Sequence, residues 1–233
     1  VWSVAPVSAD SGSTAPPIEA FASLPRIASI QLSPAGRHLA VLRHHEGKTS
    51  VETQTVTGQD VRRVVTTDNQ ESVMTWFRWA NDERLLVSLR LADAREGAEA
   101  QETRLLAVNR DGTQLHDNLL NVSAFPSIFG KKHFPQFQAR LVGTIPGDPS
   151  HVLIALDIER PLSPDVYKLD VYSGERKLVQ TNPGLQPGVR NVLQWIADRE
   201  GQLRVGVGQF GTIVRAIYKV PESTLWRELV EYD

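Results

Sequence analysis

Leu32-Ser33-Pro34-Ala35-Gly36-Arg37-His38-Leu39-Ala40 is the stretch that decides the fold. Tight turns favour Ser, Pro and Gly, and apolar residues lie on both sides of this group. Two short apolar runs joined by such a turn are typical of a β-hairpin. The stretch therefore predicts two antiparallel strands, and it opens a longer repeat.

The repeat consists of four short apolar runs separated by Gly, Pro, Asn and Asp turn signals. It occurs four times, and the first turns of the four units are marked by Pro34, Asn81, Pro149 and Asp198. These markers are 47, 68 and 49 residues apart. Two of the spacings lie near the period of a four-stranded propeller blade, roughly 40–50 residues. Insertions at 92–102 and 118–138 account for the longer spacing.

We predict an all-β fold, a β-propeller of four-stranded antiparallel blades with about four blades present and an incomplete ring. A closed four-bladed ring and a β-sandwich are the alternatives, but a sandwich has no reason to keep such a regular spacing. The second blade is expected to end in a short strand near Leu115. The predicted blades cover approximately 27–67, 73–117, 139–181 and 190–233, within a propeller region of 18–233.

Composition excludes several classes of partner. The 233 residues include 25 Lys and Arg against 27 Asp and Glu, a net charge of −2, so the chain has no basic excess for nucleic acid or anionic lipid. No stretch approaches the roughly 18 apolar residues of a membrane span. We therefore expect neither nucleic acid nor a membrane as a partner. The absence of cysteine excludes disulfides and thiolate metal sites.

The first 17 residues differ from the rest, and we interpret them as a disordered leader or the remnant of a signal peptide. Val7-Ser8-Ala9 has the small residues of a cleavage site, and a spacer rich in Ser, Thr, Ala and Pro follows. This pattern predicts a periplasmic or secreted protein. The alternative is an arbitrary boundary ahead of a disordered leader. Ile18, Phe21 and Leu24 have helical spacing and predict two helical turns before Pro25.

The motifs of common active sites are missing or lie in the wrong context. A serine hydrolase of the α/β type needs a Gly-x-Ser-x-Gly turn, and the chain has none. Residues 206–211 match the Gly-x-Gly-x-x-Gly dinucleotide pattern, but the run from Ile213 to Tyr218 that follows predicts a strand instead of the required helix. The six histidines do not show the spacing of a helical zinc site. We therefore predict no catalytic, cofactor-binding or metal-binding residue, and no cofactor.

Other conspicuous side chains are interpreted structurally. The aromatic residues on predicted strands are expected to pack between blades; they are Trp76, Phe77, Trp79, Trp195, Tyr218 and Trp226. Acidic residues at 93, 96, 99 and 102 are expected to belong to a solvated insertion. Phe125, Phe129, Phe134 and Phe137 fall in the second insertion, where they would form either a lid or partner contact, or a small cluster that holds the loop.

The turn at 32–40 resembles the blade turn Leu-Ser-Pro-Asp-Gly-Lys-x-Leu-Ala of propellers in prolyl oligopeptidases, dipeptidyl peptidases and acylaminoacyl peptidases. Ala35 replaces the usual Asp. The resemblance continues in Phe21–Pro25, in Trp79–Leu86, and from Trp195 to Trp226, so it covers roughly 18–233.

This resemblance implies a substrate-filtering propeller of a serine peptidase that acts on peptides. In that family seven or eight blades precede an α/β-hydrolase domain, so the implied partner is a C-terminal α/β-hydrolase domain of the same parent chain, with the catalytic Ser, Asp and His beyond Asp233. The Glu pair with which some dipeptidyl peptidases bind the substrate amine has no counterpart here. The alternative function is a non-enzymatic propeller that serves as a scaffold or ligand-binding module.

Overall fold

A computed structural model describes residues 24–95, 98–120, 125–126, 132–133, 135–183, 191–210 and 212–232. The leader and most of the helical segment predicted at 18–24 lie outside these residues. In the described part, the chain forms strands joined by turns and loops, as predicted for an all-β fold. Each main sheet follows the chain order, so each is an antiparallel meander.

Three sheets have four strands. The first sheet consists of β1 (Ile27–Leu32), β2 (His38–His45), β3 (Lys48–Thr55) and β4 (Arg62–Thr67). The third consists of β10 (Arg140–Ile145), β11 (Asp148–Leu156), β12 (Asp165–Asp170) and β13 (Arg176–Gln180). The fourth consists of β14 (Val192–Ala197), β15 (Leu203–Phe210), β16 (Ile213–Tyr218) and β17 (Arg227–Tyr232). The second sheet, with three strands, consists of β5 (Ser72–Trp79), β6 (Arg84–Arg95) and β7 (Ala98–Asn109).

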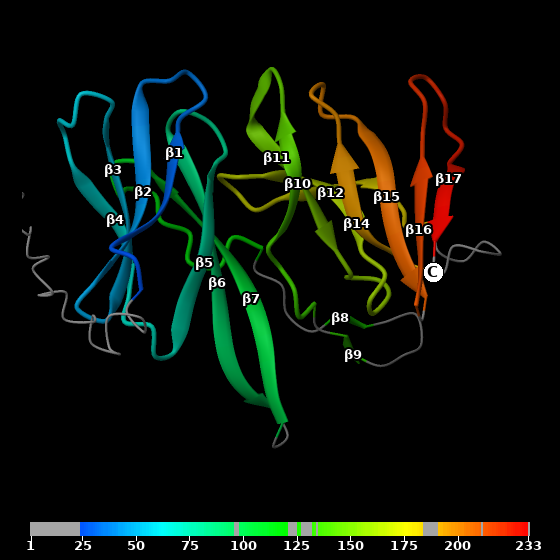
Figure 1. The fold of residues 1–233 in the computed structure, drawn as a ribbon, viewed down its shortest axis with the longest axis horizontal. Coiled ribbons are helices and arrows are strands. Elements are labelled where there is room, and N and C mark those ends of the chain that lie inside the picture. Colours follow the sequence, from blue (N-terminus) through cyan, green and yellow to red (C-terminus); the bar gives the residue numbers. More distant parts are fainter. Residues whose placement is uncertain are drawn as a thin grey trace, which may run out of the picture.

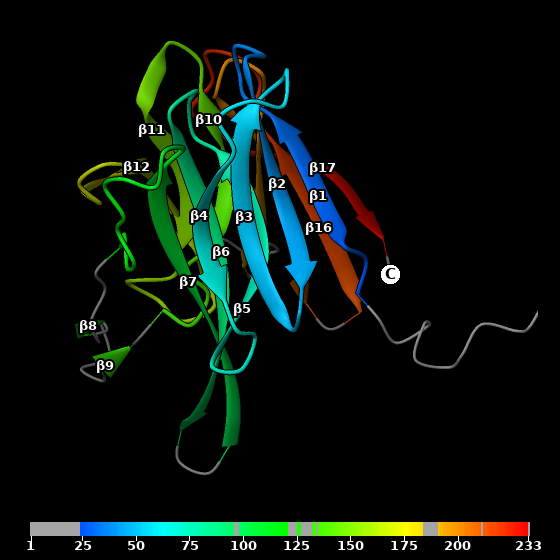
Figure 2. The same cartoon turned by 90° about the vertical axis from the view of Figure 1, so that its left-hand side faces the viewer.

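The second sheet departs from prediction in two ways. The short strand expected near Leu115 is replaced by a single bridge between Ala107 and His116, because the chain turns away to bury Leu119 and Leu120 against the third sheet. The insertion expected at 92–102 is part of a long hairpin in which β6 and β7 pair as far as Arg95 and Ala98. This hairpin projects beyond the other sheets, on the same side as the small β8–β9 sheet (Phe125–Pro126 and Lys132–His133) (Figure 2).

Local turns follow the sequence signals closely. In the first turn Gly36 has φ +73°, a conformation that glycine adopts without a steric penalty, and its N–H donates to the Ser33 carbonyl. The third unit is an exception, because its turn lies at Pro146–Gly147 and Pro149 already belongs to β11. The glycines of 206–211 precede β16, so a strand and not a helix follows them, as predicted.

The four sheets are arranged side by side as propeller blades, and in the first and fourth sheets β1 and β14 lie nearest the middle while β4 and β17 lie outside (Figure 1). Successive residues of a strand face opposite neighbours. Leu85 and Val87 pack with the first sheet while Leu86 packs with the third, and Leu153 and Ala155 pack with the fourth sheet. The core therefore consists of three seams, one between each pair of adjacent blades.

The ring is open. Each hydrophobic cluster in the described residues joins adjacent sheets, and none joins the first sheet to the fourth. Figure 1 shows these two sheets on opposite sides of the molecule. The closed four-bladed ring is therefore the wrong alternative, and the predicted incomplete ring is confirmed.

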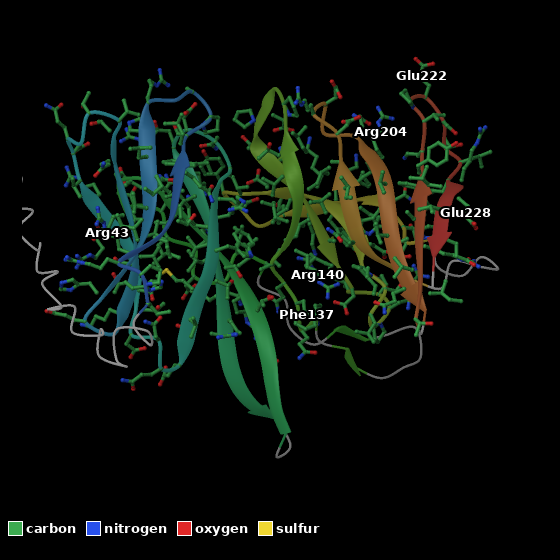
Figure 3. All side chains as sticks on the ribbon, viewed as in Figure 1. Arg43, Phe137, Arg140, Arg204, Glu222 and Glu228 are labelled. Atoms are coloured by element: carbon green, nitrogen blue, oxygen red, sulfur yellow. The ribbon has the colours of Figure 1, made fainter. Side chains whose placement is uncertain are left out.

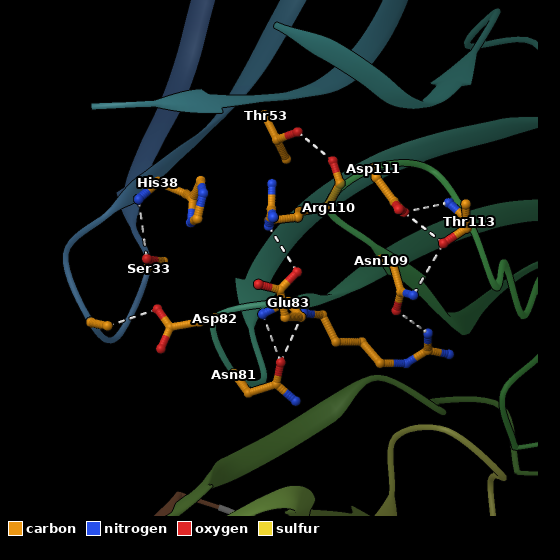
Figure 4. A network of polar contacts seen from close by, with 12 residues as sticks. Ser33, His38, Thr53, Asn81, Asp82, Glu83, Asn109, Arg110, Asp111 and Thr113 are labelled. Atoms are coloured by element: carbon orange, nitrogen blue, oxygen red, sulfur yellow. Dashed lines mark hydrogen bonds and ion pairs between the residues drawn. The ribbon is translucent and has the colours of Figure 1, made fainter. Parts of the chain in front are cut away.

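Polar contacts at the blade turns hold the seams in register (Figure 4). The Asp82 carboxylate of the second blade accepts the Ala35 N–H of the first at 2.8 Å. Thr53 Oγ1 donates to the Arg110 carbonyl at 2.5 Å. Ala35 stands where the related turns have an aspartate, so here the neighbouring blade supplies a carboxylate to this turn.

Arg84 joins the second blade to the third. It is fully buried, its Nε donates to the Val171 carbonyl at 2.5 Å, and its Nη1 donates to Asn109 Oδ1 at 2.8 Å. The guanidinium carbon lies 4.7 Å from the centre of the Tyr172 ring. Burial lowers the pKa of Arg84 from its usual value, yet arginine remains charged at neutral pH. Arg84 therefore acts as a charged link across the seam.

Candidate functional site

The candidate site is a cleft of about 440 Å³ at the inner strands of three blades. Inner strands converge because blades are arranged around an axis, and β10 lies against β14. The lining side chains come mainly from β5, β10 and β14, with Ala155 from β11. They are Trp76, Arg78, Ala139, Arg140, Leu141, Val142, Ala155, Leu193, Gln194 and Trp195.

Two arginines make this cleft cationic. Arg78 is exposed, and its Nη1 donates to the Phe77 carbonyl at 3.0 Å. Arg140 is half-buried, with its guanidinium carbon 4.9 Å from the centre of the Phe137 ring. Figure 3 shows Arg140 and Phe137 together near the lower end of β10. The ten lining residues include no Asp or Glu, so no lining carboxylate neutralises either cation.

Aromatic and aliphatic groups form the rest of the wall. Trp195 is 4% exposed, its Nε1 donates to the Pro164 carbonyl at 2.9 Å, and its ring packs edge-on against Trp226 at 5.3 Å. These contacts fix the orientation of the indole. Leu193 is 37% exposed and Trp76 is half-buried, so both present apolar surface. The cleft can therefore hold an apolar group beside an anion.

The structure brings together few of the residues considered in the sequence. Phe77, Trp79 and Trp195 are buried in the seams, as predicted for inter-blade packing. Phe137 packs beneath Arg140, while Phe129 and Phe134 lie outside the described residues. Sequence analysis missed Arg78 and Arg140, because only the convergence of distant inner strands brings them to one cleft.

The prediction that Glu102 is solvated is wrong. This residue was expected in a solvated insertion, but it is 1% exposed, and its Oε2 lies 2.6 Å from Arg104 Nη2. Both residues belong to β7 and are two positions apart, so their side chains lie on the same face of the strand, and the arginine compensates the buried carboxylate. The run of acidic residues is therefore not uniformly solvated.

The histidines and acids do not form a metal centre in the described part of the chain. His151 is close to two carboxylates, with Nδ1 2.7 Å from Asp148 Oδ1 and Nε2 3.8 Å from Asp170 Oδ2. Lys168 Nζ also lies 2.5 Å from Asp148 Oδ2, so these side chains contact one another in one polar cluster. No group of three or more His, Asp or Glu side chains suited to a metal ion is found among the described residues. Those residues also contain no helix long and apolar enough to cross a bilayer.

The fold and cleft together define a set of propeller blades with a cationic, aromatic inner wall. No model of a known protein family matches the chain. Dipeptidyl aminopeptidase BIII of Pseudoxanthomonas mexicana is 25% identical over 180 residues, which is 77% of this chain and 22% of that protein. The chain thus spans about a fifth of the length of this relative. The relative is a peptidase of a type that the sequence resemblance implied, and the predicted resemblance is confirmed.

Solved structures show likeness of fold. An oligogalacturonate lyase from Vibrio parahaemolyticus has a TM-score of 0.50 at 9% identity, covering 87% of this chain and 53% of that one. The β-propeller domain of the Trilobed protease from Pyrococcus furiosus has a TM-score of 0.42 at 13% identity, covering 87% and 68%. At 9% identity the likeness to the lyase concerns the fold only.

Proposed function

We propose that this chain is the substrate-filtering propeller of a serine peptidase that acts on peptides, and that it is not catalytic itself. The observation that carries the proposal is the 25% identity to a dipeptidyl aminopeptidase over 77% of the chain. The partner is a C-terminal α/β-hydrolase domain of the same parent chain. An open ring with a cleft on its inner wall is a suitable entrance for short or unstructured peptides. The parent protein is periplasmic or secreted.

The proposed substrate-filtering role can be tested by shortening the insertion at 118–138. Its start is firmly anchored, since Leu119 and Leu120 are each 2% exposed and Arg176 Nη1 donates to the Leu120 carbonyl at 3.3 Å. Its end is held by Thr103 Oγ1, which accepts the Gln138 N–H at 2.8 Å. Shortening 122–134 to a Gly-Ser linker leaves these anchors intact.

The proposal assigns size selection to this insertion, so we expect the shortened full-length protein to cleave long peptides faster relative to dipeptide-sized substrates. Size selectivity is measured as the ratio of kcat/KM values for short and long peptides. Mapping of a fluorophosphonate label should place the reactive serine outside these 233 residues. A label on a serine within them, lost on mutation to Ala, would contradict the non-catalytic role. Absence of peptidase activity would favour a scaffold or ligand-binding propeller.

A further inference from the structure

We infer that the inner-strand cleft binds a carboxylate group of a peptide through Arg78 and Arg140, with the neighbouring apolar group held by the cleft wall. The inference relies on the proposed function only for naming a peptide as the ligand. The expectation of a carboxylate beside an apolar group follows from the residues that line the cleft.

Several arginines elsewhere on the blades differ from these two because they are paired with carboxylates. On the first sheet Glu52 lies 2.9 Å from Arg43 Nε and 3.1 Å from Arg63 Nη2. On the fourth sheet Arg204 Nε lies 2.5 Å from Asp198 Oδ2. Each of these cations already has a carboxylate within hydrogen-bond distance and therefore has less reason to recruit an anion.

Arg84 is also without an ion pair in the described residues, but it is fully buried and donates to carbonyl and amide oxygens. Arg78 and Arg140 combine access to a cleft with the lack of an acidic partner among the described residues. Two accessible guanidiniums without lining acids give the cleft a positive potential.

The shape of the cation selects a carboxylate. A guanidinium is planar and presents parallel N–H donors that match the two oxygens of a carboxylate. The packing of Arg140 over Phe137, at 4.9 Å, restricts the orientation of its guanidinium and reduces the entropy lost on binding. Arg140 is therefore suited to hold an anionic group in a defined position, and Arg78 lines the same cleft.

The cleft wall adds selectivity for what lies next to the carboxylate. Trp76, Leu193 and Trp195 contribute apolar surface, and 440 Å³ is within the size range of small-ligand pockets. A folded domain does not fit into such a volume, whereas the end of a peptide does. Either a C-terminal carboxylate or an acidic side chain beside an apolar residue would satisfy this chemistry.

The test is isothermal titration calorimetry on the full-length protein with N-acetylated peptides. Acetyl-Ala-Ala-Phe with a free carboxylate is compared with its C-terminal amide and with acetyl-Ala-Glu-Phe amide, which carries its carboxylate on a side chain. We expect at least one carboxylate peptide to bind about tenfold more tightly than the neutral amide, and the stronger of the two identifies the source of the anion.

Arg78→Gln and Arg140→Gln should each remove most of this preference while leaving the affinity of the neutral amide nearly unchanged. Arg62→Gln is the matched control, because it removes one positive charge on an outer strand at the far end of the molecule. Thermal melting verifies that all three variants fold. Equal affinity for acidic and neutral peptides, or a full preference in both cleft variants, would overturn the inference.

The two proposals fail in different ways. If the protein prefers carboxylate peptides but hydrolyses none, the proposed function is rejected and the inference about the cleft stands. If the protein hydrolyses peptides with size selectivity but binds carboxylate peptides and neutral amides equally, the proposed function stands and the inference about the cleft is rejected.

Discussion

Asp148 begins β11 and lies between two positively charged or protonatable side chains. The hydrogen bond from Lys168, at 2.5 Å, is the main cause that lowers its pKa from 3.8 to about 2, and the hydrogen bond from His151, at 2.7 Å, is the next. Stabilisation of the charged form in the folded state makes folding depend on pH. Because the folded pKa is lower than the unfolded one, this stabilisation is present above about pH 4 and is lost as the pH falls towards 2.

Asp148→Asn should therefore lower the free energy of unfolding at pH 7, and its difference from the parent should shrink between about pH 4 and 2. Urea unfolding at a series of pH values measures this difference. Asp60→Asn is the control, because its ion pair with Arg62 is exposed and surface pairs contribute little. A difference for Asp148→Asn that stays constant through the acid range would show that its carboxylate charge is not responsible.

At the scale of elements, the β12–β13 turn contacts the start of the insertion at 118–138. Gly174 has φ +76°, and a Cβ at this position would overlap the Leu119 carbonyl oxygen. Gly112 has a similar φ of +86° but has open space around it. Comparing alanine variants at these two positions therefore distinguishes the stability lost to backbone conformation from the stability lost to a steric clash.

Gly174→Ala should destabilise the protein by about 2–4 kcal/mol, because it adds overpacking to the penalty of a left-handed backbone. Gly112→Ala should cost only about 1–2 kcal/mol, which is the backbone penalty alone. Chemical denaturation of both variants measures the difference. If the two variants lose equal stability, then the contact with Leu119 adjusts without cost.

Turn residues and apolar runs were enough to predict the strands of this fold, because these signals are local. Pro34 and Gly36 mark the first turn, and the run at 152–156 becomes part of β11. The second sheet lacks its predicted fourth strand because the chain instead buries Leu119 and Leu120. This could not be predicted, since it depends on the space between two blades. The cleft is equally non-local: Arg78 and Arg140 are 62 positions apart, and neither belongs to a recognisable motif.

At the scale of the whole molecule, the two end sheets present different free faces. On the first sheet that face carries the Arg43, Glu52 and Arg63 group. On the fourth sheet it carries apolar rows, because residues paired across strands share a face. Val207, Ala216 and Val230 form one row, and Ile196 and Val205 begin the next. The fourth sheet therefore has apolar surface of the kind that is buried at the three seams.

The isolated chain should self-associate through this face at micromolar concentrations, because an unpartnered apolar sheet face gains free energy when a second copy covers it. Val230 is 45% exposed on the outer strand β17, so Val230→Lys should fold normally and shift the chain towards monomer. Val56→Lys is the matched control, since Val56 is 50% exposed in the turn between β3 and β4 of the first sheet. Size-exclusion chromatography with light scattering over a concentration series measures the mass. A monomer at every concentration, or equal association of the two lysine variants, would show that the apolar rows do not drive assembly.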